Sequence, residues 1–435
     1  MAGLTFHIEA WLGTFLDDLL ERETIASLRI AAGADGIPLT EVEDTMAHTV
    51  RRHINVPAYS LARWLLVNWW RLRWEPYRVN PSYDWLSSHC MGAIGGDYAW
   101  PALTFSSDGE FIQLRLQSET SADACALRYL RDVTVDVAAA DFEQAVDSFV
   151  DDVEARIAVR APAERELAEL REELREEQRD AGQSIVCKLQ ALAGLDPGSA
   201  PNGWMVAAQA LVTQVGAFAT AEILAVTPAL EGGLGSANAA VSAMRDSATT
   251  VKLDWGAVKP TPAPANEIPW ERGARLAREF RARQGIPPGP LAKNTLEQLL
   301  DASLPLPLSP WKGQRQLRGG YRNGRTDGRA ALLVTSQRED SQRFYLGRLV
   351  AAALVSAVDQ HVLPVSDAAT ALQKLERSFA QELLCPWQDL DAFTDHSGTD
   401  DDGIAEAAEH FIVSERLVLS TLVNKGKIPR SRLQP

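Results

Sequence analysis

Cysteine is scarce in this chain of 435 residues, which contains only Cys90, Cys125, Cys187 and Cys385. No two of them form a Cys-x-x-Cys pair, so the sequence excludes a disulfide framework and a cysteine-rich zinc site. Scattered cysteines of this kind are typical of proteins that stay in a reducing compartment.

Long apolar runs are lacking as well. The least charged stretch, 203–230, is interrupted by Gln209, Gln214, Glu222 and Pro228, which makes it too polar to cross a membrane. The N-terminus has no basic segment followed by an apolar core, so we expect no signal peptide. We therefore expect a cytoplasmic protein with no membrane partner.

Positive charge is in deficit. The 43 Lys and Arg residues are outnumbered by 58 Asp and Glu, which gives a net charge of −15 at pH 7. The chain as a whole should therefore bind nucleic acid or anionic membranes poorly in a non-specific way. Walker A, Gly-x-Ser-x-Gly and Rossmann patterns are also absent from the sequence.

The length and the residue patterns that are present predict an α+β protein of several parts. We expect a mixed α+β domain over 1–160, a helical connector over 161–259 and a mostly helical domain over 266–435. The Pro-rich segment 260–265 between the last two is the predicted linker, because its alternating prolines cannot continue a helix or a sheet.

Alternating polar and apolar residues predict the N-terminal strands. One hairpin is expected around Asp35-Gly36, and a second is expected over 102–117, followed by a strand at 133–137. Asp141 is the expected N-cap of the next helix, whose apolar positions recur at helical spacing up to Ile157.

Tryptophan is concentrated on one predicted helix, which we expect to start at Ser60 as its N-cap and to contain Trp64, Trp69, Trp70 and Trp74. Such a stripe normally packs in a core. The alternative is an exposed surface for a partner protein, formed by Trp69, Trp70 and Trp74.

A further helix over 163–179 carries leucines that indicate either packing along one face or a short dimer coil.

Two segments of the C-terminal part match a family pattern. Arg343-Phe344 leads into a helix with a broad apolar face, and a later helix ends in Phe379-Ala380-Gln381-Glu382-Leu383-Leu384-Cys385-Pro386. This layout resembles that of the ImmA/IrrE-type zinc metallopeptidases. In those proteins two helices and a small hairpin precede a His-Glu-x-x-His helix, and a Glu on a later helix completes the metal site. The resemblance implies a zincin-like fold over 266–435.

The residues that would carry the chemistry are missing. In the family register the first His position falls on Arg348, the Glu on Leu349 and the second His on Ala352, while the third ligand falls at Gln373, near Glu376. A zinc peptidase needs two imidazoles and a Glu that activates water. We therefore expect no catalytic residue, metal or cofactor. Zinc bound by Asp359, His361 and Glu376 is the alternative.

The loss of the ligands leaves two interpretations of the old groove. Leu349 and Ala352 could simply fill it as part of a well-packed core. Alternatively, the groove could still bind a polypeptide or another ligand without cutting it, with Arg348 facing an anion. Against that interpretation, the side chain of Arg348 could simply reach solvent.

An arginine- and glycine-rich stretch, 315–329, is the basic island of the acidic chain. It is expected to be a flexible connector, with phosphate or nucleic-acid contacts as the alternative. Its arginines are Arg315, Arg318, Arg322, Arg325 and Arg329.

The stretch 404–418 has the spacing of a helix-turn-helix. Ala408 should lie at the helix crossing, Ser414 should cap the second helix, and Val418 should be buried. The exposed residues of the second helix are too apolar for a typical groove reader, which favours a packing role over DNA recognition.

Taken with the resemblance, these patterns suggest a regulatory or defence-linked pseudoenzyme that binds another protein without cleaving it. An active metal-dependent endopeptidase and a nucleic-acid-binding regulator are the alternatives. The oligomeric state is left open by the sequence.

Overall fold

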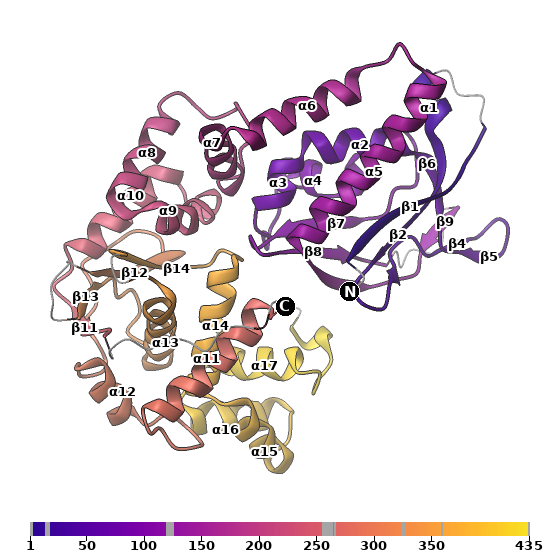
Figure 1. Cartoon of the computed structure of the whole chain (residues 1–435). Coiled ribbons are helices and arrows are strands. Elements are labelled where there is room, and N and C mark those ends of the chain that lie inside the picture. The colour runs from indigo at the N-terminus through magenta and orange to yellow at the C-terminus, as the bar shows by residue number, and fades with distance from the viewer. Residues whose placement is uncertain are drawn as a thin grey trace. The chain divides into compact units, whose positions relative to one another are not determined.

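The structure is a computed structural model that describes residues 3–13, 18–118, 126–254, 264, 267–322, 328–357 and 360–433. The described chain has an α+β fold and separates into two compact units, Met1–Pro201 and Asn202–Pro435 (Figure 1). None of the helices in the described residues is long and apolar enough to cross a membrane.

The described residues of the N-terminal unit form three small antiparallel sheets. In the first, β2 (Ile25–Ala32) pairs with β1 (Leu4–Trp11), β3 (Ile37–Pro38) and β6 (Ile54–Pro57). The second has the order β5-β4-β9 and the third the order β10-β8-β7. Their strands are β4 (Val42–Asp44), β5 (Thr49–Arg51), β7 (Leu103–Ser107), β8 (Phe111–Leu116), β9 (Leu127–Tyr129) and β10 (Val133–Ala138).

Both predicted hairpins are confirmed. Ala31 pairs with Pro38 across the turn that contains Gly36, and Ser107 pairs with Ile112 across the second turn. The side chain of Asp108 closes that second turn by accepting hydrogen bonds from the N–H groups of Glu110 and Phe111. The predicted strand at 133–137 is also confirmed, as β10.

Helices pack over these sheets to form the N-terminal core. The longest is α5 (Ala139–Arg160) (Figure 1). The ring centroid of its Phe149 lies 5.3 Å from that of Phe6 on β1. The other helices are α1 (Leu19–Thr24), α2 (Ala58–Val67), α3 (Trp69–Trp74), α4 (Tyr83–His89), η1 (Met91–Ala93), α6 (Glu166–Arg179) and α7 (Ala181–Leu192). Leu167 and Leu174 of α6 belong to this core, which confirms the packing interpretation of that helix.

Two predicted N-caps are wrong. α2 begins at Ala58 after Pro57, so Ser60 lies inside the helix. α5 begins at Ala139, so Asp141 lies in its first turn, where its negative charge complements the helix dipole instead of capping the end. The tryptophan helix is also divided at Asn68, whose side-chain N–H₂ donates to the carbonyl of Trp64.

In the described part of the C-terminal unit the strands form an antiparallel sheet of order β11-β13-β12-β14 (Figure 1). Its strands are β11 (Thr250–Lys252), β12 (Leu317–Arg322), β13 (Arg329–Leu332) and β14 (Val362–Ser366). The helices before the hairpin are α8 (Trp204–Val215), α9 (Ala217–Leu224), η2 (Thr227–Ala229), α10 (Gly233–Arg245), α11 (Pro269–Arg283) and α12 (Lys293–Leu300). Those after it are α13 (Glu339–Val355), α14 (Ala371–Leu384), α15 (Trp387–Ser397), α16 (Asp401–Phe411), α17 (Glu415–Asn424) and η3 (Arg430–Leu433).

The division between the units differs from the predicted one. The structure separates the chain after Pro201, within the predicted connector 161–259. The second half of the predicted connector belongs to the C-terminal fold, because its strand β11 pairs with β13 and its helix α9 contacts β14. The predicted linker 260–265 lies outside the described residues except for Pro264.

Candidate functional site

The two helices that carry the family pattern pack directly against each other. α14 starts at the N-cap Thr370, whose hydroxyl accepts from the N–H of Gln373, and it ends at Leu384, two residues before Pro386. Gly347 on α13 faces Ala380 on α14 so closely that a Cβ at Gly347 would lie 3.0 Å from the Ala380 Cβ. This contact between small residues brings the middle of α13 close to α14.

Arg348 lies at the centre of this contact and is almost fully buried. Its Nη2 donates to the carbonyl of Ser366 at 2.7 Å and to Oε1 of Gln373, and it lies 3.4 Å from Oε2 of Glu376. The structure therefore brings together three of the predicted positions, Arg348, Gln373 and Glu376. Burial of Arg348 rules out the prediction that its side chain reaches solvent.

Glu376 is part of the same buried cluster. Its side chain has no exposed surface, and Arg348 is its cationic partner. The predicted positions Leu349 and Ala352 belong to the hydrophobic core of the C-terminal unit, also without exposed surface. They fill the inner face of α13, as the packing interpretation expects.

Sequence reasoning missed three further members of this cluster: Glu222, Thr370 and Arg377. Glu222 on α9 accepts at Oε2 from the hydroxyl of Thr370 at 2.6 Å and from Nε2 of Gln373 at 3.1 Å. Arg377 donates to the carbonyls of Ser366 and Ala368. The sequence did contain one signal for this cluster. Glu222 is the sole charged residue of α9, which is otherwise mostly apolar, and a charged residue in such a helix indicates a buried group with a partner.

Burial dominates the electrostatics of this cluster. It raises the pKa of Glu376 to about 8 and also raises that of Glu222, because a carboxylate loses its hydration in a buried site. Burial lowers the pKa of Arg348 to about 9, and the neighbouring charge of Arg377 lowers it further. A guanidinium keeps its proton in proteins, so Arg348 is a cation beside the two carboxyl groups.

The cluster does not fit the zinc ion that the family resemblance implies. A guanidinium has no free lone pair for a metal, and its positive charge already lies beside Glu376. Among the described residues there is no group of three or more His, Cys, Asp or Glu side chains that could hold a metal ion.

Two of the three alternative zinc ligands can be compared, and they lie in different surroundings. His361 is exposed, lies 3.2 Å from the carbonyl of Arg322 through Nδ1, and stacks on Tyr321. Glu376 has no exposed surface, and Asp359 lies outside the described residues.

Part of the arginine-rich stretch 315–329 lies in the sheet, because 317–322 form β12 and Arg329 begins β13, while 323–327 lie outside the described residues. For these strand residues the prediction of a flexible connector is wrong. Arg318 lies over the ring of Tyr345, Arg322 donates to the carbonyls of Ala353 and Ala357, and Arg329 pairs with Asp301. Arg315 is exposed, and Arg325 lies outside the described residues. Three of the five arginines thus have internal partners.

The predicted partner surface of tryptophans is mostly buried. Trp69 and Trp70 belong to the N-terminal core, and the indole N–H of Trp70 donates to Glu177 at 2.6 Å. Trp74 is half-buried between the cationic groups of Arg73 and Lys188. The core interpretation therefore replaces that of an exposed surface.

The helix-turn-helix spacing at 404–418 is confirmed as a packed helix pair, α16 and α17. Ser414 caps α17 by accepting from the N–H of Leu417, while Ala408 and Val418 are buried in the C-terminal core. Ile412 occupies the turn with φ of 55°. These contacts favour the packing role.

Comparisons of the chain with protein-family models, with curated proteins and with solved structures find no match.

Proposed function

We propose that the chain is a regulatory or defence-linked interaction protein whose C-terminal unit is a pseudo-metallopeptidase that binds a protein partner without cleaving it. The observation that carries this proposal is Arg348. It stands at the position of the first zinc ligand in the family register, and its guanidinium bonds to Ser366, Gln373 and Glu376.

The order of elements supports the same interpretation. Helices α11 and α12 and the hairpin β12–β13 come before α13, as two helices and a small hairpin precede the metal-site helix in the ImmA/IrrE pattern. Gln373 on α14, at the position of the third ligand, accepts from Arg348 at the position of the first, and the neighbouring Glu376 also lies beside Arg348. A cation that belongs to the protein would thus take over the charge balance that a metal provides in an active peptidase.

A cytoplasmic location is part of the proposal. Cys187 and Cys385 are buried free thiols, which fits a reducing compartment. The internal contacts of Arg318, Arg322 and Arg329 give no support to the alternative of nucleic-acid binding.

Two measurements test the proposal. Elemental analysis of the purified, untagged chain after incubation with zinc should find no stoichiometric metal, and the chain should not hydrolyse unfolded protein substrates. Zinc that is retained at one per chain and lost in Glu376→Gln would overturn the proposal and favour the endopeptidase alternative.

Partner binding needs its own test. Cross-linking in the native cells identifies a candidate partner protein. That protein should bind the purified chain in solution and remain intact. Its affinity for the 202–435 unit should fall when exposed residues of that unit are substituted. Cleavage of that protein by the chain would contradict the proposed function.

A further inference from the structure

Strand β1 has one open edge. Among the described residues β2 is the strand that pairs with it, and α5 packs over one of its faces (Figure 1). The N–H of Gly33 donates to the carbonyl of Gly3, so Gly3 and every second residue after it bond to β2. The main-chain N–H and C=O groups of Leu4, Phe6 and Ile8 therefore point away from β2, and within the described residues none of them has a hydrogen-bond partner.

The sequence of β1 does little to protect this edge. Its eight residues contain no proline or lysine, which commonly keep another strand from pairing with an edge. The register shifts between Ile8 and Ala10, so the regular open stretch runs from Leu4 to Ile8, about 17 Å of extended chain. Because its outward N–H and C=O groups are unpaired, this stretch can accept one more strand.

Helix α5 runs along the same edge. At the start of β1, a Cβ added to Gly3 would lie 2.6 Å from that of Asp141 on α5. Asp152 lies on the same side of the helix, because the interval of 11 residues between the two makes about three turns, or about 16 Å along the axis. A strand added beside β1 would therefore pass both carboxylates.

A hollow of about 410 Å³ lies where α5 passes the end of β1. Val159 in its wall is 77% exposed, so apolar surface faces solvent there. Side chains on one face of a strand recur every second residue, so an added strand can place one of them in this hollow. The lining residues are Ile8 and Trp11 of β1 and Asp152, Ala155, Arg156 and Val159 of α5.

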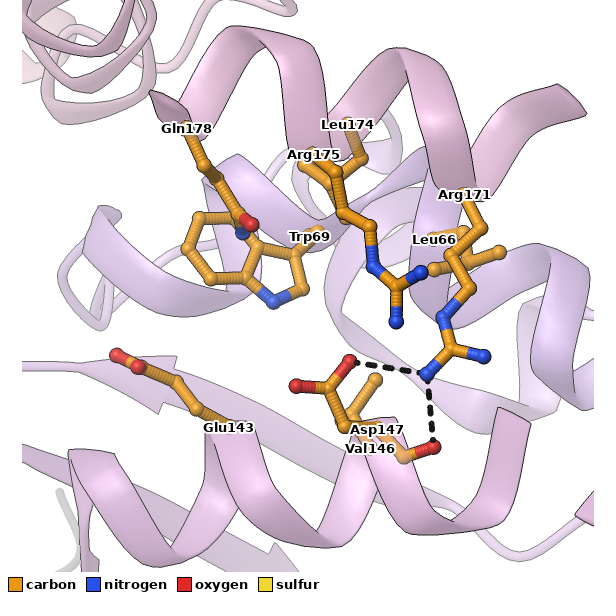
Figure 2. Close-up of a pocket in the computed structure, with 9 residues that line it drawn as sticks. All are labelled: Leu66, Trp69, Glu143, Val146, Asp147, Arg171, Leu174, Arg175 and Gln178. Carbon is orange, nitrogen blue, oxygen red and sulfur yellow. Dashed lines mark hydrogen bonds and ion pairs between the residues drawn. The ribbon is translucent and has the colours of Figure 1, made fainter. Parts of the chain in front are cut away.

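The carboxylates on the two sides of α5 differ in their pairing. On the side of α6, Arg171 pairs with both Asp147 and Asp151, and Figure 2 shows the first of these pairs. On the side of β1, Asp141 and Asp152 have no ion pair within the described residues. The open edge is therefore bordered by negative charge that the chain does not balance there.

We propose that β1 binds an extended segment of a partner protein by strand addition, and that this segment carries two basic residues and one apolar residue on the side that faces α5. Its main chain would pair with Leu4, Phe6 and Ile8. The basic residues would pair with Asp141 and Asp152 from positions four apart, since four extended residues span about 14 Å and basic side chains are long. The apolar residue, two positions beyond the second basic one, would enter the hollow.

Charge is the reason for choosing a basic partner over a second copy of the chain. Two β1 strands paired about a twofold axis would bring the two Asp152 sides together, and each chain already has a net charge of −15. The cation of the hollow, Arg156, is already held over the ring of Trp11 and donates to the carbonyl of Glu23. The inference concerns the N-terminal unit alone, so it does not depend on the proposed function of the C-terminal unit.

Calorimetric titration of the full chain with two capped heptapeptides tests the proposal. Lys-Thr-Val-Thr-Lys-Thr-Leu suits a strand parallel to β1, and the reverse sequence, Leu-Thr-Lys-Thr-Val-Thr-Lys, suits an antiparallel one. We expect one of them to bind, and its analogue with Glu in place of both Lys residues to bind at least about tenfold more weakly, since each charge-assisted contact is lost.

Methylation of single peptide N–H groups tests the main-chain pairing. Alternate N–H groups of an added strand face β1, so N-methylation of the central Thr and of the neighbouring Val should differ in effect. We expect one of the two methylated peptides to bind about tenfold more weakly than the other, because it alone loses a hydrogen bond to the edge. Equal affinity of the two would overturn strand addition.

Asp152→Lys should weaken binding of the lysine peptide about tenfold or more, because it replaces an attraction with a repulsion. Glu169→Lys is the matched control, since Glu169 is exposed on α6 and undergoes the same change of charge. Circular dichroism of both variants confirms that they are folded.

Absence of binding by both heptapeptides at millimolar concentration would overturn the inference. Equal affinities for the lysine and glutamate peptides, or equal losses in Asp152→Lys and Glu169→Lys, would do the same. A dimer of the wild-type chain that dissociates in Ile8→Pro would show that a second copy occupies the edge, since proline removes an outward N–H that an edge strand can spare.

Discussion

The buried carboxyl group of Glu376 makes the stability of the chain depend on pH. Its pKa is raised by burial from 4.5 to about 8, so the folded state favours the protonated form. Its contribution to stability is therefore fully present below pH 4.5 and is lost as pH rises through about 8. Glu222 acts in the same direction, because burial raises its pKa as well.

Glu376→Gln should therefore reduce the fall in unfolding free energy between pH 5 and pH 8. Glu406→Gln is the control, because Glu406 is exposed on α16. Urea unfolding at several pH values measures the slope. Equal slopes in Glu376→Gln and the wild-type chain would show that Glu376 does not titrate in this interval.

Arg348 is predicted to matter mainly as the partner of Glu376. Arg348→Met should lower the unfolding free energy by about 1–3 kcal/mol, because it leaves the buried oxygen atoms of Ser366, Gln373 and Glu376 without their donor. The double variant Arg348→Met/Glu376→Leu should regain part of that loss. A double-mutant cycle by chemical denaturation measures the coupling, and additive effects would contradict a direct interaction.

Ile412 provides a test of backbone strain. Its φ of 55° lies in the left-handed region, which costs a β-branched residue about 1–2 kcal/mol. Ile412→Gly should therefore raise the unfolding free energy by up to about 1 kcal/mol, part of the gain being offset by the freer unfolded chain. Ile412→Val keeps the β-branched side chain and should give no gain. A fall in stability in Ile412→Gly would mean that the side chain contributes more than the strain costs.

At the scale of elements, alternation and helical spacing were enough to predict much of the fold. They predicted the hairpin β7–β8, the strand β10 and the inner face of α5, since each buries one face against a core. They failed at β12, because its Arg318-Gly319-Gly320 segment carries no apolar alternation. That strand is defined by close packing between neighbours, which a local pattern does not reveal.

Gly319 shows how close that packing is. A Cβ there would lie 2.4 Å from the carbonyl oxygen of Leu363 on β14, a backbone atom that cannot move away cheaply. Gly319→Ala should therefore destabilise the chain by several kcal/mol. Gly235→Ala is the matched control, because Gly235 is helical and its added Cβ would meet no atom within 4 Å. It should be neutral or stabilise by about 1 kcal/mol. Thermal unfolding compares the two variants.

The candidate site was likewise predictable in part. The family register placed Arg348, Gln373 and Glu376 at one site, and the structure brings them together. Thr370 and Arg377 lie on the same helix as two of these residues, but Glu222 comes from α9, 148 residues before Thr370. A contact over that sequence separation depends on the tertiary fold and not on local spacing.

At the scale of the whole molecule, the two compact units predict that the chain can be divided. Fragments 1–201 and 202–435 should each fold when expressed alone, because each has its own hydrophobic core. A cut at 260 would separate β11 from β13 and should give a C-terminal fragment of lower stability. Circular dichroism and thermal unfolding of the fragments measure the difference, and equal stability of fragments 202–435 and 261–435 would contradict it.

The central claim is that the C-terminal unit keeps a metallopeptidase arrangement without its ligands. Its most direct test is the zinc affinity of the variant Arg348→His/Leu349→Glu/Ala352→His, which restores the family motif opposite Glu376. We predict that this variant, once shown to be folded, binds one zinc ion per chain, whereas the wild-type chain and the single variant Arg348→His do not. A folded triple variant without zinc affinity would contradict the account.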